Sequence, residues 1–299
     1  MKIALASDVH LEFGGIVFEN TENADVLVLS GDIITAAQLG PHDDDPHDLL
    51  GMTRSKQWHE FFQNCCNEFP HVVYVMGNHE HYNGDFSKTE NILRERLGYL
   101  ENLHFLEKQM VALGDFIFYG GTLWTDMNNE DPNTLNHVKL RMNDYRVLNT
   151  PNEVRFTDED GNPHSRPGHL MPEDTVVEHK AFLAGLKECL DIHNDQKFIV
   201  VGHHAPSKQS TKPKYESDHL LNGAYSSDLS EFILDHPRIM AFTHGHTHHQ
   251  FCYNVGSTLI ACNPRGYIGY ERQANDWELA YFEIRDGKAV PTVGWRDAP

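Results

Sequence analysis

The sequence has little positive charge. Its 24 Lys and Arg residues face 44 Asp and Glu residues, so the formal net charge is −20. A surface this acidic repels nucleic-acid backbones and anionic membranes at long range. We therefore expect no stable nucleic-acid binding and no membrane association. The charge does not exclude an anionic substrate, because two divalent metal ions would add about +4 at a site.

The sequence also lacks a cysteine framework and a long hydrophobic run. Its five Cys residues form no CxxC pair, and this odd number predicts reduced thiols in a reducing compartment. No stretch approaches the ~18 apolar residues that span a bilayer. The apolar run that starts at Lys2 is ended by Asp8 and is too short for a signal peptide. We therefore expect a cytoplasmic protein, and the sequence does not indicate its oligomeric state.

What the sequence does contain is a set of five short apolar runs, each followed within two residues by Asp, Asn or His. Such runs are typical of buried parallel strands. Loops that follow the carboxyl ends of parallel strands face one shared crevice, so the polar residues at these ends are expected to meet. The five runs are Ile3–Ser7, Val26–Ser30, Val72–Met76, Phe198–Gly202 and Ile239–Thr243.

The rest of the chain predicts helices between these strands and antiparallel pairs elsewhere. Aromatic residues at helical spacing predict an amphipathic helix over Ser55–Glu68, and Ser87 with Glu90 predicts a capping box for a helix that ends near Leu97. A third helix is expected from Pro172 to His193. Short alternating segments near residues 104–119 and 250–293 predict antiparallel strands.

We expect a single domain over residues 1–299. The region from about 126 to 172 contains few clear signals, apart from Leu135, Val138 and Met142 on one helical face. Its length and composition predict an excursion beside the active-site edge. The acidic stretch Pro41–Asp48 has flanking prolines and no periodicity, which favours a solvated loop over a metal site.

Seven residues at the strand ends form a candidate metal-binding set. Together they offer two carboxylates, four imidazoles and one amide oxygen, a mixture that suits Mn, Fe, Zn, Co or Ni. Seven ligands with one shared carboxylate are enough for two metals, which can generate hydroxide and bind both oxygens of a displacement at phosphorus. The set comprises Asp8, His10, Asp32, Asn78, His203, His246 and His248.

These residues lie in motifs that resemble those of the calcineurin-like metallophosphoesterases. The motifs D-x-H, G-D, G-N-H-E, H and G-H-x-H occur in this order between residues 8 and 248. The resemblance implies a four-layer α/β/β/α sandwich with two mixed sheets and metals at the strand ends. It also implies the following ligand sets: Asp8, His10 and His248 for one metal, Asn78, His203 and His246 for the other, and Asp32 as the bridge.

The same resemblance implies a mechanism. A hydroxide that bridges the metals would be the nucleophile, His79 would protonate the leaving oxygen, and Glu80 would orient His79. We expect two divalent transition metals, with Mn as the first choice and Fe, Zn, Ni or Co as alternatives. The stretch Asn263–Tyr267 resembles small bacterial or phage members of the family.

The substrate is indicated by what is missing from these motifs. Phosphoprotein phosphatases of this superfamily carry two arginines beside the metals, whereas Ala36 and Met76 occupy those positions here. A phosphodiester monoanion needs less positive charge than a monoester dianion, so we expect a phosphodiesterase with a small or nucleotide-type substrate. A phosphomonoesterase, a DNA nuclease and a non-catalytic scaffold remain alternatives. The candidate substrate contacts are Arg141, Asn143, Arg265 and His204, the last of which could instead support the ligands from behind.

Overall fold

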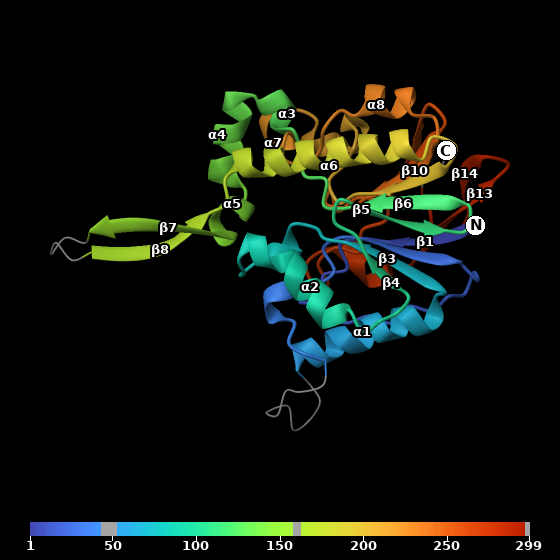
Figure 1. Ribbon diagram of the computed structural model, residues 1–299, viewed down its shortest axis with the longest axis horizontal. Coiled ribbons are helices and arrows are strands. Elements are labelled where there is room, and N and C mark those ends of the chain that lie inside the picture. Colours follow the sequence, from blue (N-terminus) through green and yellow to red (C-terminus); the bar gives the residue numbers. More distant parts are fainter. Residues whose placement is uncertain (43–52, 158–162, 297–299) are drawn as a thin grey trace.

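The computed structural model describes residues 1–42, 53–157 and 163–296, and it contains two large sheets packed face to face (Figure 1). The first sheet has the order β14 (Lys288–Pro291), β13 (Ala280–Arg285), β1 (Lys2–Ala6), β2 (Val26–Ser30), β3 (His71–Val75), β4 (Leu103–Phe105). The second has the order β11 (Phe251–Val255), β12 (Thr258–Cys262), β10 (Ile239–His244), β9 (Lys197–Val201), β6 (Phe116–Gly120), β5 (Gln109–Leu113). Each sheet has a parallel centre and an antiparallel edge, so both are mixed.

Alternate residues of the central strands face different layers. In β1, Ile3 and Leu5 belong to a core between the two sheets, whereas Ala4 and Ala6 belong to a core beneath the outer helices. Successive side chains of a strand point to opposite faces, which is why one apolar run serves two cores. The same division holds along β2 and β3. The predicted four-layer sandwich is therefore confirmed.

Helices cover the outer face of each sheet. Helix α1 (Arg54–Glu68) and helix α2 (Thr89–Leu97) lie on the first sheet, while α6 (Pro172–Ile192) and α8 (Ser230–Asp235) lie on the second (Figure 1). The aromatic stripe expected in the first helix is part of the core, and Thr53 accepts a hydrogen bond from the backbone amide of Lys56 at its start.

The capping box predicted for α2 is wrong. Ser87 lies in a short 3-10 turn, Phe86–Lys88, and its backbone amide donates to the side chain of Asp85 at 3.0 Å. Asp85 thus caps the preceding turn, and α2 continues from that turn with no side-chain cap of its own. The local Ser-x-x-Glu pattern did not reveal that a stronger acceptor stands two residues earlier.

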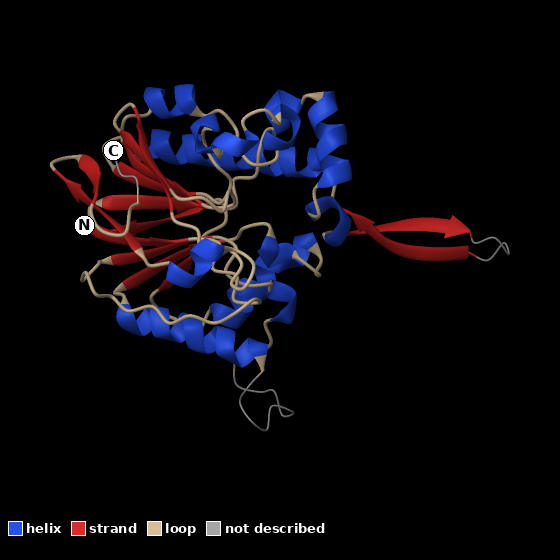
Figure 2. Ribbon diagram, turned by 180° about the vertical axis from the view of Figure 1, so that it is seen from behind, coloured by secondary structure: helices blue, strands red, loops and turns tan. Residues whose placement is uncertain are grey.

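The excursion forms its own small group of elements. It contains α3 (Met127–Glu130), α4 (Pro132–Arg141), α5 (Asp144–Val147) and the hairpin β7 (Asn149–Thr157) with β8 (Pro163–His169). The hairpin projects away from the sheets (Figure 2), whereas the helices pack with α6 and with α7 (His219–Asn222). The sequence did not predict the hairpin, and the single-domain expectation stays a prediction.

Two further expectations meet the limits of the described chain. The three consecutive aspartates of the acidic stretch, Asp43–Asp45, lie outside the described residues. Within residues 1–42, 53–157 and 163–296, no helix combines the length and the apolar character needed to cross a membrane.

Candidate metal centre

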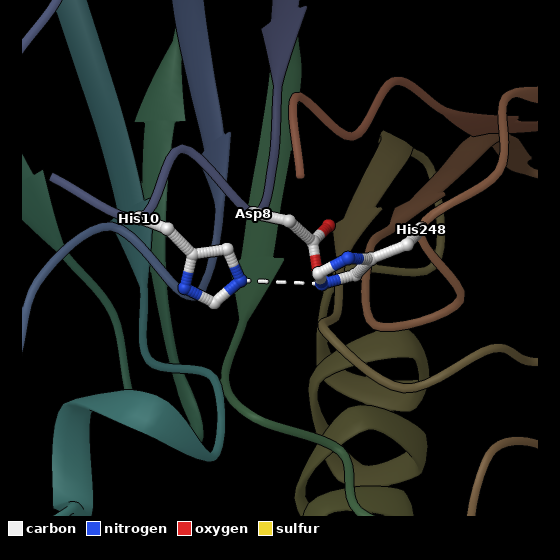
Figure 3. A group of neighbouring side chains, drawn as sticks. All are labelled: Asp8, His10 and His248. Atoms are coloured by element: carbon white, nitrogen blue, oxygen red, sulfur yellow. Dashed lines mark hydrogen bonds and ion pairs between the residues drawn. The ribbon is translucent and has the colours of Figure 1, made fainter. Parts of the chain in front are cut away.

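The fold brings all seven predicted ligands to one edge of the two sheets. They follow β1, β2, β3, β9 and β10, five strands that end side by side in the two packed sheets. One group is Asp8, His10 and His248 (Figure 3). In this group the Nε2 atoms of His10 and His248 lie 3.2 Å apart, and Nε2 of His248 lies 3.4 Å from an Asp8 carboxylate oxygen.

The second group surrounds the amide of Asn78. The Asn78 Oδ1 lies 3.1 Å from Nε2 of His203 and 3.0 Å from Nδ1 of His246. Asp32 stands between the two groups, because its Oδ2 is 3.4 Å from Nε2 of His203 and 3.7 Å from Nε2 of His10. One carboxylate oxygen is therefore within reach of both groups.

In three of the four histidine ligands, an acceptor holds the ring nitrogen that points away from the centre. His10 Nδ1 faces Glu12 Oε1 at 3.0 Å, His248 Nδ1 faces Glu271 Oε1 at 2.8 Å, and His203 Nδ1 faces the carbonyl oxygen of Ser30 at 2.8 Å. Such partners hold each Nδ1 as the donor and leave Nε2 free to bind a metal.

A divalent metal fits these residues. Asp8 Oδ2 is buried and has no hydrogen-bond partner among the described residues. A buried carboxylate oxygen with no partner is costly unless an ion or another group compensates it. Imidazole and carboxylate donors without thiolate suit Mn, Fe, Co, Ni or Zn, as expected from the sequence.

The backbone is strained at the ligands. Positive φ angles occur at Asp8 (48°), His10 (48°), Asp32 (56°), His246 (65°) and His248 (48°). Non-glycine residues rarely adopt this left-handed conformation, and its clustering is typical of functional sites. The surrounding fold therefore holds these side chains in positions that a relaxed loop would not keep.

Glycines beside the ligands are required by space. A Cβ on Gly77 would lie 2.2 Å from Asp32 Oδ1, and one on Gly245 would lie 2.5 Å from Asp8 Oδ2. Any side chain at these positions would displace a carboxylate of the centre. Close approach of Asp32 is therefore the reason for a glycine at position 77.

His79 lies next to the centre and has partners on both ring nitrogens. Its Nδ1 is 3.1 Å from Glu12 Oε1, and its Nε2 is 3.3 Å from the hydroxyl of Tyr267. Burial disfavours the charged imidazole, but the carboxylates of Asp32 and Glu12 outweigh this effect and raise the pKa of His79. The raised pKa thus favours the charged form of the ring, in which each nitrogen carries a proton.

Glu80 does not orient His79, and that expectation is corrected. Its carboxylate accepts hydrogen bonds from the backbone amides of Asp32 (3.0 Å), Ile33 (2.7 Å) and Gly77 (2.6 Å) and from the hydroxyl of Tyr74 (2.8 Å). Glu80 therefore ties the loop after β2 to the loop after β3. The residue that faces His79 is Glu12, two positions after His10 in the sequence.

A cavity of about 430 Å³ opens over the centre. Arg141 and Asn143, two of the predicted substrate contacts, line one wall of it together with Asp144. Another wall comes from the segment between β9 and α8, which contributes Lys212 and Tyr215. Residues of the excursion thus line part of the cavity.

Two predicted substrate contacts do not line this cavity. Arg265 is buried, and its guanidinium donates to the carbonyl oxygens of Val9, Gly14 and Gly15, so it holds the loop after β1. His204 is also buried and lies behind His246, with ring centroids 4.2 Å apart. The prediction of Arg265 as a substrate contact is therefore corrected, and His204 takes the supporting position.

Sequence reasoning missed four residues around the site: Glu12, Lys212, Tyr267 and Glu271. Glu12 follows the first motif at a spacing that allows it to reach back to His10. Tyr267 belongs to the stretch in which we chose Arg265 instead. Lys212 and Glu271 carry no local signal, because their neighbours in space are far away in the sequence.

Comparison with known proteins agrees with this geometry. A sequence model of the calcineurin-like phosphoesterases matches residues 1–250. The chain belongs to this family. It is therefore a metal-dependent phosphoester hydrolase with candidate divalent-metal ligands at the edge of its sheets.

A protein relative and two solved structures are similar to the chain. An uncharacterized protein of Acanthamoeba polyphaga mimivirus is 28% identical over 265 residues, which cover 80% of this chain and 86% of the relative. A phosphopantetheinyl hydrolase from Mycobacterium tuberculosis matches with a TM-score of 0.63 and 12% identity, over 100% of this chain and 98% of the other. A dimetal phosphatase from Danio rerio matches with a TM-score of 0.53 and 14% identity, over 96% and 93%. The structural matches support the fold.

Proposed function

We propose that the chain is a phosphodiesterase that acts on a small or nucleotide-type substrate with two divalent transition metals, Mn2+ as the first choice. The observation that carries the diester preference is the character of Ala36 and Met76. Both side chains are uncharged and buried, so these positions contribute no cation to the cavity. A phosphodiester monoanion needs fewer positive charges than a monoester dianion, which favours the diester.

The roles of the metal ligands follow the two groups of side chains. Asp8, His10 and His248 would hold one ion, and Asn78, His203 and His246 the other, with Asp32 between them. Two such ions would lower the pKa of a bound water to near neutrality. They would also stabilise the charge that develops on the phosphoryl oxygens.

His79 would then protonate the leaving oxygen. Because Glu12 faces Nδ1, the proton available to the substrate is the one on Nε2, beside the hydroxyl of Tyr267. A raised pKa keeps the His79 imidazole protonated to a higher pH than usual, as a general acid requires. Once the proton has left, Glu12 still fixes the direction of the ring, so Nε2 remains aimed at the cavity.

A phosphomonoesterase is the second candidate, and the cavity wall favours it. Arg141 and Lys212 both line the cavity, and they could supply the charge that the two missing arginines do not.

The acidic surface still argues against a nucleic-acid substrate. All five cysteines are free thiols, as we expect for a cytoplasmic protein.

The test is hydrolysis of bis-p-nitrophenyl phosphate and p-nitrophenyl phosphate by the full chain after chelation and addition of Mn2+, Ni2+, Zn2+, Fe2+ or Mg2+. We expect a higher kcat/KM for the diester with a transition metal. A preference for the monoester would show that Arg141 and Lys212 replace the arginine pair. Two bound metals without turnover of either substrate would refute both candidates.

A further inference from the structure

Three aromatic side chains form a strip that leads from the candidate metal centre to solvent. The ring centroid of Tyr267 lies 4.5 Å from that of His10, and the centroid of Phe13 lies 4.7 Å from that of Tyr267. The centroid of Tyr270 lies 5.8 Å beyond that of Phe13. Such distances are typical of aromatic pairs in contact. We call Tyr267, Phe13 and Tyr270 the aromatic strip.

The outer end of the aromatic strip is exposed. Tyr270 exposes 80% of its surface and Phe13 exposes 42%, whereas Tyr267 is half-buried and lines the cavity. Single exposed apolar residues are common on proteins and need no explanation. These exposed rings, however, continue a wall of the cavity, and a contiguous apolar patch in such a place marks a surface that binds a ligand.

The two segments that carry the aromatic strip are fastened to each other. The guanidinium of Arg265 donates to the carbonyl oxygen of Gly14 at 2.7 Å, next to Phe13. The backbone amide of Tyr270 donates to the carbonyl oxygen of Tyr267 at 3.1 Å, which closes the turn between these two residues. The aromatic strip is therefore preformed, so a ligand would lose little free energy in ordering it.

The aromatic strip begins on the side of the centre where the leaving group is expected. The hydroxyl of Tyr267 lies 3.3 Å from Nε2 of His79, the proposed general acid. The oxygen that this nitrogen would protonate belongs to the leaving alcohol. The rest of that alcohol would therefore lie beside Tyr267 and extend toward Phe13 and Tyr270.

The chemistry of the aromatic strip favours a planar, uncharged group. Nucleic-acid bases stack on aromatic side chains, because every base has a π face. A base adds no charge to a chain whose formal net charge is −20. A diester of one nucleoside carries a single phosphate, whereas a nucleic-acid strand would carry many and would be repelled. The combination therefore favours a nucleoside ester over a polynucleotide.

We propose that the aromatic strip binds the base of a nucleoside that is the leaving alcohol of a phosphodiester. This inference rests on the proposed phosphodiesterase function and deepens it, because it names both the substrate class and the bond that is broken. In the hydrolysis, a water oxygen forms a bond to phosphorus, and the bond from phosphorus to the nucleoside oxygen breaks. That oxygen takes the proton from Nε2 of His79.

The experiment determines which ester bond the full chain breaks, with Mn2+, in the methyl ester of thymidine monophosphate. Both leaving groups are primary alcohols, so the ratio of thymidine to methanol reports binding and not the leaving-group pKa. We expect thymidine to be the main alcohol released. Tyr270→Ala should lower the ratio about 5- to 150-fold, the range for loss of one stacking contact to a base. Phe13→Leu, which keeps an apolar side chain but removes the plane, should lower it in the same direction.

The product ratio separates binding from a structural role, because it does not depend on the amount of active enzyme. A variant that only loosens the fold or the centre would slow both cleavages and leave the ratio unchanged. The matched control is Val17→Ala, which shortens a 69% exposed apolar side chain in the same connection between β1 and β2 as Phe13. It should keep the wild-type ratio, and both Val17→Ala and Tyr270→Ala should keep the wild-type melting temperature.

Two further measurements test other occupants of the aromatic strip. The methyl ester of octyl phosphate offers an apolar leaving group without a plane. If Tyr270→Ala shifted the ratio of octanol to methanol as strongly as that of thymidine to methanol, the surface would bind any apolar group. A wild-type dimer in sedimentation that Tyr270→Ala dissociates would assign the surface to a second copy of the chain. Either result would overturn the assignment to a base.

The outcomes also separate this inference from the proposed function. If wild type hydrolyses bis-p-nitrophenyl phosphate but releases mainly methanol from the thymidine ester, or does not cleave that ester, the inference is wrong and the phosphodiesterase stands. An unchanged product ratio in both Tyr270→Ala and Phe13→Leu would also refute it. Two bound metals without turnover of any diester would refute the phosphodiesterase, and the inference with it.

Discussion

Replacing Glu12 by Gln should lower kcat/KM about 30-fold while the chain remains folded. One oxygen of Glu12 serves two histidines, because Oε1 faces His10 Nδ1 at 3.0 Å and His79 Nδ1 at 3.1 Å. The other oxygen, Oε2, is buried without a partner among the described residues. The glutamine oxygen can keep both contacts but loses the charge.

The magnitude follows from these two contacts. Hydrogen bonds to a charged group contribute about 1.5–3 kcal/mol, against about 1 kcal/mol for a neutral pair. Loss of the charge thus costs about 1 kcal/mol per bond, or about 2 kcal/mol for the two. At 1.36 kcal/mol per tenfold, this is about a 30-fold effect, shared between metal affinity and proton transfer.

The same residue predicts a pH dependence of stability. Burial raises the pKa of Glu12, but hydrogen bonds from His10 and His79 outweigh this and lower it from 4.5 to about 2. Because the folded-state pKa is depressed, the carboxylate stabilises the chain above pH 4.5, and this contribution is lost as the pH falls toward about 2. This lowering of the Glu12 pKa by about 2.5 corresponds to roughly 3 kcal/mol in the free energy of unfolding. In urea unfolding of metal-free protein, the difference between wild type and Glu12→Gln should be largest at pH 7 and smaller at pH 4.

The assay is steady-state hydrolysis of bis-p-nitrophenyl phosphate at one Mn2+ concentration near the wild-type dissociation constant, so that losses in metal affinity and in proton transfer both lower kcat/KM. Glu19→Gln, which changes an exposed carboxylate on the same segment, is the matched control and should behave like wild type. If Glu12→Gln kept its kcat/KM within twofold of wild type, the reasoning about Glu12 would be refuted.

Three further predictions concern the centre and the cavity wall. Asp32→Asn should abolish turnover and weaken both metal sites, and two tightly held Mn2+ ions in calorimetry would contradict the bridging role. His79→Ala should keep both metals and lose rate mainly on esters with poor leaving groups; an equal loss across leaving-group pKa would exclude a general acid. Lys212→Gln should raise KM about 5- to 30-fold, because one charged contact contributes about 1–2 kcal/mol. The control is Lys214→Gln, which removes a cation outside the cavity and should leave KM unchanged.

Much of the centre could be predicted because its ligands follow short apolar strands. Parallel strands place their carboxyl ends at one edge of a sheet, so a local pattern such as Gly77-Asn78-His79 already indicates where the side chains will meet. The four layers were implied by the resemblance to the family, and the strands agree with it. A strand such as β1, with apolar side chains on both faces, is covered on one face by the second sheet and on the other by helices.

The errors arose where a side chain finds its partner across the fold. Glu80 was assigned to its neighbour His79, yet its carboxylate turns to backbone amides of the loop after β2. Arg265 was assigned to phosphate because it is a cation near the motifs, yet its guanidinium donates to three backbone carbonyl oxygens of the loop after β1. Residue type indicated what each group could bind, and only packing decided what it does bind.

The sequence by itself therefore determined the family, the layered fold and the seven candidate ligands, because these depend on strand periodicity and on the order of short motifs. Only the tertiary structure decided the partners that hold the ligands: Glu12 at His10, Glu271 at His248 and the carbonyl oxygen of Ser30 at His203. The physical reason is that a hydrogen bond depends on distance and direction in space. Residues 173 positions apart, such as Ser30 and His203, acquire them only when the two sheets pack face to face.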